Sequence, residues 1–167
     1  MEDPPYAPVS DTGTTSFILP EEPVEVFATG SVLVREEIGA IGDVDTTTVV
    51  LKTGSGIHCQ IINSRHCVFG FDQRIEAFGP LGAVHADNPR IDEVRVFTAD
   101  RTDSRSRLPD FFLERYTESY NREWRAFLDC LTNGRAPEAT FEDGLQALRI
   151  AEAANESLKT GASVRIS

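Results

Sequence analysis

The spacing of apolar residues changes once along this 167-residue chain, and that change constrains its fold more than any other feature. From Pro23 to Thr98, apolar and β-branched residues come in short alternating stretches joined by glycine- or proline-containing connections, which is typical of strands. From Leu113 onward, apolar residues recur every three or four positions, which is typical of helices. Strands followed by helices predict an α+β fold built on an antiparallel or mixed sheet.

These stretches predict six strands, with a seventh at the sheet edge near the C-terminus. Their residues are 23–34, 46–51, 57–64, 74–78, 83–86 and 94–98, then 162–166.

Two amphipathic helices are predicted after the strands. Gly134 ends the first helix, because glycine readily adopts the left-handed conformation that follows a helix. Thr140 caps the start of the second helix, and Gly161 ends it. We expect the apolar stripe of the first helix to be core; it consists of Leu113, Tyr116, Tyr120, Trp124, Phe127 and Leu131.

The charge and the cysteine content limit the partners and the compartment. Acidic side chains outnumber basic ones by 27 to 16, and a formal charge of −11 disfavours nucleic acid and membrane surfaces as partners. Three cysteines without a disulfide-framework spacing, and no readable secretory signal, favour a cytoplasmic protein.

Residues 1–20 are rich in proline and predict an extended N-terminal arm, and residues 21–167 predict a single domain.

No cofactor-binding or metal-binding residue is predicted. A dinucleotide fingerprint needs three glycines between a strand and a helix, whereas Gly54-Ser55-Gly56 lacks the third glycine and precedes a strand pattern. The pairs His58-Cys59 and His66-Cys67 are eight residues apart, about 26 Å along one strand, which is too far for one zinc ion unless the chain bends. We therefore interpret the glycines as a hairpin turn and the cysteines as ordinary buried residues.

The densest polar stretch follows the third predicted strand. Asn63, Arg65, Asp72 and Gln73 supply donors and acceptors suited to a hydroxyl-rich ligand in a cleft at the end of the sheet. The alternative is a solvated loop with an Arg65–Asp72 ion pair. Three residues are candidates for acid/base chemistry: His66, Asp72 and His85. The candidates are weak because no sequence spacing makes any pair of them specific.

Several sequence blocks, taken in order, resemble one known family. They lie between about Phe17 and Ile166 and comprise residues 21–30, 42–46, 63–65, 69–76, 111–116 and 141–144. Each block is weak by itself, but the ordered series is specific. With these blocks the chain resembles the C-terminal domain of the inositol 2-dehydrogenase-like oxidoreductases of the Gfo/Idh/MocA family.

The resemblance implies an open sheet of about six or seven strands with helices packed on one face. In that family the other face commonly forms the oligomer interface, so a homodimer or tetramer through the sheet is expected. The family's substrate cleft lies between this domain and a preceding Rossmann domain, which carries NAD and a catalytic lysine in a Glu-Lys-Pro motif. Glu-Lys-Pro does not occur in these 167 residues, and residues 10–16 lack the family's Asp-x-x-x-His pair.

The resemblance also implies substrate-binding positions for a polyol or sugar. The family usually has tyrosine where this chain has Phe69 and Phe71, so two hydroxyl groups that could hold a sugar alcohol are missing. The implied positions are Asn63, Arg65, Phe69, Phe71, Asp72 and Gln73.

Three functions follow as expectations. The chain is the substrate-binding and oligomerisation half of an NAD-dependent inositol or sugar dehydrogenase, without cofactor or redox activity by itself; a separate Rossmann-domain protein would then be a partner. Alternatively, it is a non-catalytic assembly module. As a third alternative, it is a cofactor-independent isomerase, cyclase or lyase that uses the former substrate cleft.

Overall fold

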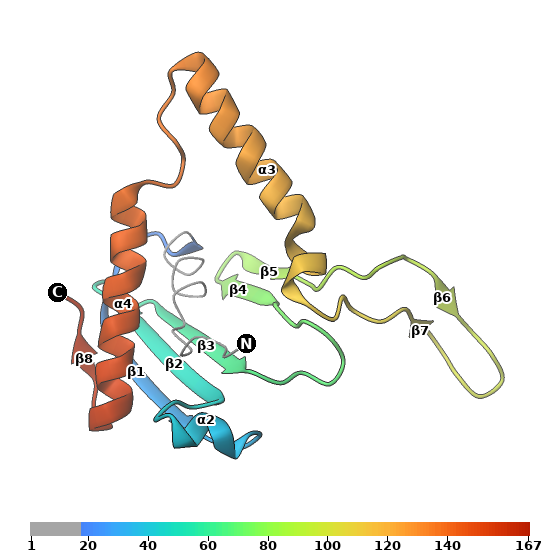
Figure 1. Ribbon diagram of the computed structural model, residues 1–167, viewed down its shortest axis with the longest axis horizontal. Helices are drawn as coiled ribbons and strands as arrows, with labels where there is room; N and C mark the ends of the chain where they lie inside the picture. Colours follow the sequence, from blue (N-terminus) through green and yellow to red (C-terminus); the bar gives the residue numbers. More distant parts are fainter. Residues whose placement is uncertain (1–17) are drawn as a thin grey trace. The chain divides into compact units, whose positions relative to one another are not determined.

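The computed structural model describes residues 18–167, which form two compact units (Figure 1). Of the described residues, the first unit contains 18–66 together with Glu138–Ser167, and the second contains Cys67–Pro137. Nearly all of the predicted N-terminal arm, residues 1–20, lies outside the described residues. This division does not test the prediction that residues 21–167 form a single domain, which stays a prediction.

The first unit is built on a four-stranded antiparallel sheet. The strand order is β3 (His58–Ser64), β2 (Thr46–Thr53), β1 (Pro23–Ser31) and β8 (Val164–Arg165). The connection from β1 to β2 contains the short helix α2 (Glu36–Ala40), whereas β2 and β3 are joined by a tight turn. The predicted strands at 46–51, 57–64 and 162–166 therefore correspond to β2, β3 and β8.

Helix α4 (Phe141–Thr160) packs on one face of this sheet and forms the core with it (Figure 1). Strand residues that alternate in sequence point toward α4, among them Val26 and Ala28 of β1 and Leu51 of β2. Helix α4 packs against these residues with small side chains such as Ala154, which allow its backbone to lie close to the strands. Burial of this apolar face, rather than helix propensity, fixes where α4 lies.

The ends of α4 follow the sequence-based predictions. The Thr140 hydroxyl accepts a hydrogen bond from the Asp143 N–H, and the Asp143 carboxylate accepts one from the Thr140 N–H, which completes a capping box. At the other end Gly161 adopts the left-handed conformation, with φ of 67°. Both predicted boundaries are confirmed.

The second unit holds two small antiparallel ribbons and a long helix. The ribbons pair β4 (Ile75–Gly79) with β5 (Gly82–Ala86), and β6 (Arg95–Val96) with β7 (Ser104–Arg105). The helix is α3 (Phe112–Asn133). The α+β class and the antiparallel pairing are thus confirmed, but the strands are divided among three sheets because β4 and β6 pair only with their sequence neighbours.

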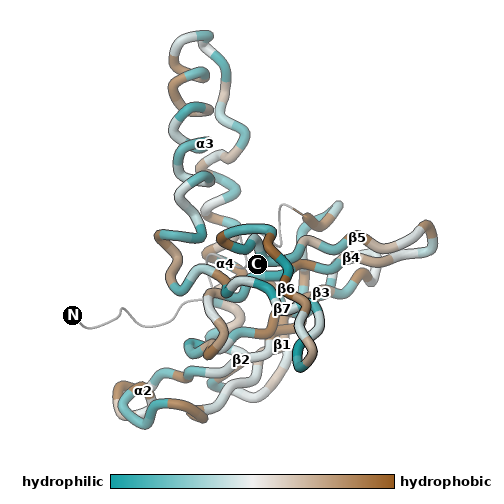
Figure 2. Tube along the Cα trace, turned by 90° about the vertical axis from the view of Figure 1, so that its right-hand side faces the viewer, coloured by the Kyte–Doolittle hydropathy of each residue, from teal (hydrophilic) through white to brown (hydrophobic). Residues whose placement is uncertain are grey.

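The aromatic stripe of α3 differs from the prediction. No residue of α3 is buried, and Tyr120, Trp124 and Phe127 are each at least 49% exposed. Hydrophobic and hydrophilic residues alternate along the helix with the expected period (Figure 2). The prediction that this stripe is core was wrong because periodicity identifies the apolar face of a helix but not whether another element covers it.

No helix within residues 18–167 is both long enough and apolar enough to cross a membrane.

Ser157 joins α4 to the sheet by hydrogen bonds, which makes it a sensitive point for mutation. Its buried hydroxyl accepts from the Ala28 N–H at 2.8 Å and donates to the Ala162 carbonyl at 2.6 Å. Ser157→Ala leaves both buried backbone groups without a hydrogen-bond partner, so we expect the free energy of unfolding to fall by about 1–3 kcal/mol. Denaturation followed by circular dichroism measures this loss. Ser31→Ala, an exposed serine of β1, is the matched control and should change stability little.

Candidate functional site

The structure divides the predicted site residues between the two units. The first unit contains Asn63, Arg65 and His66. The second contains Phe69, Phe71, Asp72, Gln73 and His85. Each unit therefore contains its own local arrangement of these residues.

In the first unit, Arg65 lies just after β3 and pairs with Asp43. Its Nη2 is 3.0 Å from Asp43 Oδ2, and both side chains are more than four-fifths buried. Asp72 belongs to the second unit, so the alternative of an Arg65–Asp72 ion pair stays a prediction. Asn63 is half-buried within β3, where it lies opposite Thr47 of β2.

Asp45 holds the loop beside Arg65. Its buried carboxylate accepts hydrogen bonds from the N–H groups of Leu33, Val34 and Arg35 at 2.8–2.9 Å, and from the Thr46 hydroxyl. Its backbone carbonyl accepts the Arg65 N–H at 2.8 Å. Burial raises the pKa of Asp45, but these hydrogen bonds lower it more, so the net pKa lies well below its ordinary value. This carboxylate organises backbone rather than acting on a ligand.

In the second unit, Asp72 is the centre of a hydrogen-bonded polar cluster. Arg74 donates to both carboxylate oxygens, at 2.8 Å each, and Asn88 Nδ2 donates to Oδ1. The hydrogen bonds from Arg74, followed by that from Asn88, lower the pKa of Asp72 although partial burial opposes them. Asp72 is therefore ionised near neutral pH and is a poor general base, which favours a binding role over proton transfer.

Gln73 continues this cluster toward α3. Its N–H donates to Asn88 Oδ1 at 2.7 Å, and its side-chain oxygen accepts a hydrogen bond from the Tyr116 hydroxyl. Phe71 packs edge-on against the Tyr116 ring with the centroids 5.6 Å apart. Phe69, in contrast, is more than half exposed. The cluster in the second unit thus joins Phe71, Asp72 and Gln73 with Arg74, Asn88 and Tyr116.

A close backbone approach at Gly70 holds this segment. Gly70 has φ of 114°, and a Cβ added there would lie 2.8 Å from Leu108 Cβ and 2.9 Å from the Pro109 carbonyl oxygen. The next residue, Phe71, donates its N–H to the same Pro109 carbonyl at 2.7 Å. Only glycine fits this position.

The weak acid/base candidates are divided between the units, with His66 in the first and Asp72 and His85 in the second. His66 is exposed beside Ser64, to whose hydroxyl its N–H donates. His85 lies on β5 opposite Glu76, with Nδ1 3.6 Å from the Glu76 carboxylate, and both side chains are largely exposed. Within the second unit, no hydrogen bond links Asp72 to His85. Their catalytic role stays a prediction.

The residues present do not fit a bound dinucleotide. Gly54-Ser55-Gly56 forms the turn between β2 and β3, and no helix begins there. Its Ser55 N–H and hydroxyl donate to the Glu21 carboxylate, so an acidic group occupies the place a phosphate would need. Residues 18–167 also contain no group of three histidine, cysteine or acidic side chains placed to hold a metal ion.

Two members of the polar cluster, Asn88 and Tyr116, were missed by the sequence analysis. Asn88 is sixteen residues from Asp72 and carries no local signal of that contact. Tyr116 was assigned to the apolar stripe, although a hydroxyl group on such a stripe is itself a sign that a polar partner is needed.

Acidic pH should destabilise the fold, because it protonates the Asp45 carboxylate. Because the folded-state pKa is depressed from 3.8, the ionised carboxylate stabilises the fold above about pH 4, and this contribution disappears as the pH falls further. Asp45→Asn should lower the melting temperature at neutral pH by about 3–6 °C and reduce the acid dependence. Asp100→Asn, at a largely exposed carboxylate, is the control. Equal melting curves for both variants would contradict the role given to Asp45.

Gly70→Ala should destabilise the second unit, because the new Cβ meets atoms on the Leu108–Pro109 segment that cannot all move away. We expect a loss of about 1–3 kcal/mol. Trp124, the only tryptophan of the chain, lies in this unit, so its fluorescence reports the unfolding. Gly79→Ala, where nothing lies within 4 Å of an added Cβ, should leave the transition unchanged.

Comparison with known proteins identifies the family. The family model described as "Oxidoreductase family, C-terminal alpha/beta domain", of Gfo/Idh/MocA, matches residues 12–166. The chain is 47% identical over 158 residues to a myo-inositol 2-dehydrogenase of Thermotoga maritima and 42% identical over 150 residues to an inositol 2-dehydrogenase of Rhizobium meliloti. These matches cover 95% and 90% of this chain but 47% and 45% of the relatives.

Solved structures agree with this assignment. The crystal structure of a myo-inositol dehydrogenase from Corynebacterium glutamicum superposes with a TM-score of 0.89 at 39% identity, over 95% of this chain and 47% of that one. The chain therefore spans about half the length of the relatives it matches. It belongs to the Gfo/Idh/MocA oxidoreductase family and corresponds to the C-terminal α/β domain of the inositol dehydrogenase-like members.

Proposed function

We propose that this chain is the substrate-binding and assembly half of a dehydrogenase that acts on an inositol or a related polyol. The observation that carries this proposal is the polar cluster of the second unit, centred on Asp72. Its members come from three separate segments, the 71–74 loop, Asn88 and the start of α3, and they converge by hydrogen bonds. The named relatives with 47% and 42% identity are inositol dehydrogenases, which supports a polyol as the ligand class.

The cluster keeps polar capacity for hydroxyl groups. An ionised carboxylate has about four acceptor positions, and Arg74 and Asn88 occupy three of those of Asp72. The Gln73 amide nitrogen, a donor, bonds to no acceptor among residues 18–167. An acceptor next to a donor is the pairing that a ligand hydroxyl satisfies, since each hydroxyl both donates and accepts.

In this proposal the chain does not transfer a hydride by itself. Hydride transfer requires a nicotinamide held against the substrate, and the glycine stretch of this chain is a hairpin turn closed by Glu21. A Rossmann domain, in the same polypeptide or in another one, would hold the cofactor. The chain's part is to bind and orient the polyol.

The uncovered face of the four-stranded sheet supports assembly as the second part of this role. Phe27 and Val50 are neighbours on the face opposite α4, and so are Thr48 and Ile62. Ile62 is 72% exposed and Phe27 is 39% exposed. Apolar side chains on an open sheet face are typical of interaction surfaces, so we propose that two or four copies associate there.

A purely structural assembly module is the second candidate. It is favoured by the β4–β5 ribbon, where Phe78, Leu81 and Val84 are each more than two-thirds exposed. This surface adds to the apolar area available for partners and uses none of the polar cluster. Ligand binding separates the two candidates, because an assembly module has no need of a polyol.

The test is calorimetric titration of the purified chain with myo-inositol. We expect saturable binding that Asp72→Asn weakens about tenfold, since the variant loses the charge that orients Arg74 and accepts hydroxyl groups. Tyr116→Phe keeps the ring contact with Phe71 and removes only the hydroxyl bound to Gln73, so a smaller loss is expected.

Asp100→Asn is the control for the loss of one carboxylate in the same unit and should bind as the parent does. NAD and myo-inositol together should produce no NADH with this chain. If no polyol binds while light scattering shows a dimer or tetramer, the assembly module replaces the substrate-binding role. Formation of NADH would contradict the proposed division of labour.

A further inference from the structure

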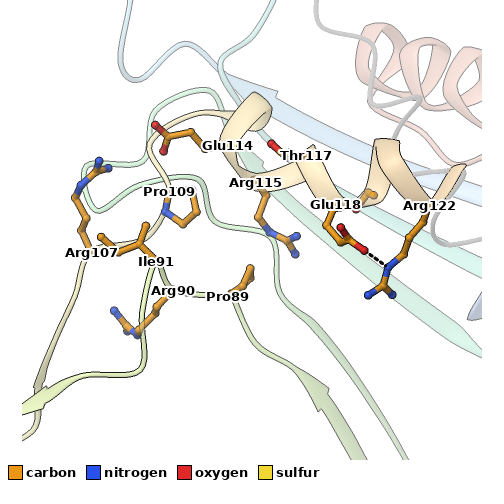
Figure 3. Close-up of a pocket in the computed structure, with 11 residues that line it drawn as sticks. Pro89, Arg90, Ile91, Arg107, Pro109, Glu114, Arg115, Thr117, Glu118 and Arg122 are labelled. Carbon is orange, nitrogen blue, oxygen red and sulfur yellow. Dashed lines mark hydrogen bonds and ion pairs between the residues drawn. The ribbon is translucent and has the colours of Figure 1, made fainter. Parts of the chain in front are cut away.

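The second unit contains an open groove of about 650 Å³ beside the start of α3 (Figure 3). Four arginines line it. Arg90 and Arg107 come from the loops that flank the β6–β7 ribbon, and Arg115 and Arg122 come from α3 (Figure 3). The whole chain has only 16 basic side chains against 27 acidic ones, so this concentration runs against its overall charge.

Two of the four guanidinium groups are neutralised by neighbouring carboxylates. Arg122 pairs with Glu118 at 3.0 Å, one turn back on α3, and Arg107 pairs with Asp110 at 2.5 Å. Both pairs are largely exposed, so they contribute little to stability. They do reduce the positive charge that these two arginines offer to a ligand.

The other two arginines have no carboxylate within 4 Å among residues 18–167. Arg90 donates to the Ser106 carbonyl at 2.5 Å, which orients its guanidinium without neutralising it. Arg115 lies over the Tyr116 ring, 5.5 Å from the centroid, and its buried Nε has no hydrogen-bond acceptor in the described part of the chain. A buried donor without an acceptor is costly unless a ligand completes it.

The groove has the size and the walls of a small-molecule site. Its volume falls within the range of ligand pockets, about 300–1,000 Å³. Pro89, Ile91 and Pro109 give it an apolar wall. Guanidinium groups form paired hydrogen bonds with the oxygens of phosphate and carboxylate groups, which lysine cannot match in geometry.

Two carboxylates at the groove limit where an anion can sit. Glu118 is engaged by Arg122, and Glu114 accepts the Asp110 N–H. The two carboxylates repel an anion from their own positions, whereas Arg90 and the guanidinium of Arg115, which pair with no carboxylate among residues 18–167, attract it.

We propose that this groove binds a small molecule carrying two negative charges on oxyanion oxygens, with Arg90 and Arg115 holding the charged part and the Pro89–Ile91 and Pro109 wall covering an apolar part. The site is distinct from the polar cluster around Asp72 and does not depend on the polyol proposal. A phosphate monoester and a dicarboxylate share this chemistry, and the experiment separates them.

The experiment is titration of the full chain with glycerol 3-phosphate and, separately, with malonate, at about 0.15 M ionic strength so that unspecific charge attraction is screened. We expect one of the two probes to bind saturably. Arg90→Gln should weaken this binding at least about tenfold and leave the melting temperature unchanged, because Arg90 is exposed. Arg115→Gln should weaken it similarly.

Arg101→Gln removes an exposed arginine of the same unit that does not line the groove, and it should bind as the parent does. Stronger binding of glycerol 3-phosphate identifies a phosphate site, and stronger binding of malonate identifies a carboxylate site. The proposal is overturned if neither probe binds, if Arg90→Gln binds as Arg101→Gln does, or if all three variants lose affinity equally.

Discussion

The contact between α4 and the sheet is the interaction on which the first unit depends. Alanines of the helix let it approach the strands closely, and the Ser157 hydroxyl completes the hydrogen bonding of β1 at Ala28, beyond the two-residue pairing of β1 with β8. Gly30 shows how tight the packing is, because an added Cβ would lie 3.0–3.2 Å from Val44, Thr47 and Leu158. One helix therefore sets both the apolar core and the edge of the sheet.

Backbone-directed contacts position the polar residues of both units. In the first unit, the Asp45 carboxylate gathers three successive N–H groups and its carbonyl holds Arg65. In the second unit, the loop that contains Asp72 and Gln73 is held against Pro109 by the close approach of Gly70 and by the Phe71 N–H. Side chains held through their neighbours' backbone in this way lose less conformational entropy on binding a ligand, which is the role proposed for Asp72 and Gln73.

Features with a local sequence signal are predictable from the residues alone. Strand alternation, the Thr140 cap and the glycines at 134 and 161 all depend on neighbouring residues, and the structure has them as predicted. Prediction from sequence does not reveal contacts that join distant segments, such as the hydrogen bond from Asn88 to Asp72. The short strand β7 was also missed, because two residues carry no periodicity.

Residue order by itself determined the α+β class, the ends of the two long helices, the absence of a dinucleotide fingerprint within these residues, and the resemblance to the Gfo/Idh/MocA family. Only the tertiary structure decided that Asn88 and Tyr116 join Asp72 and Gln73, that four arginines line one groove, and that the stripe of α3 is uncovered. The reason is physical. Helix and strand periods arise from local backbone geometry, whereas side chains far apart in sequence meet only where the packing of whole elements brings them together.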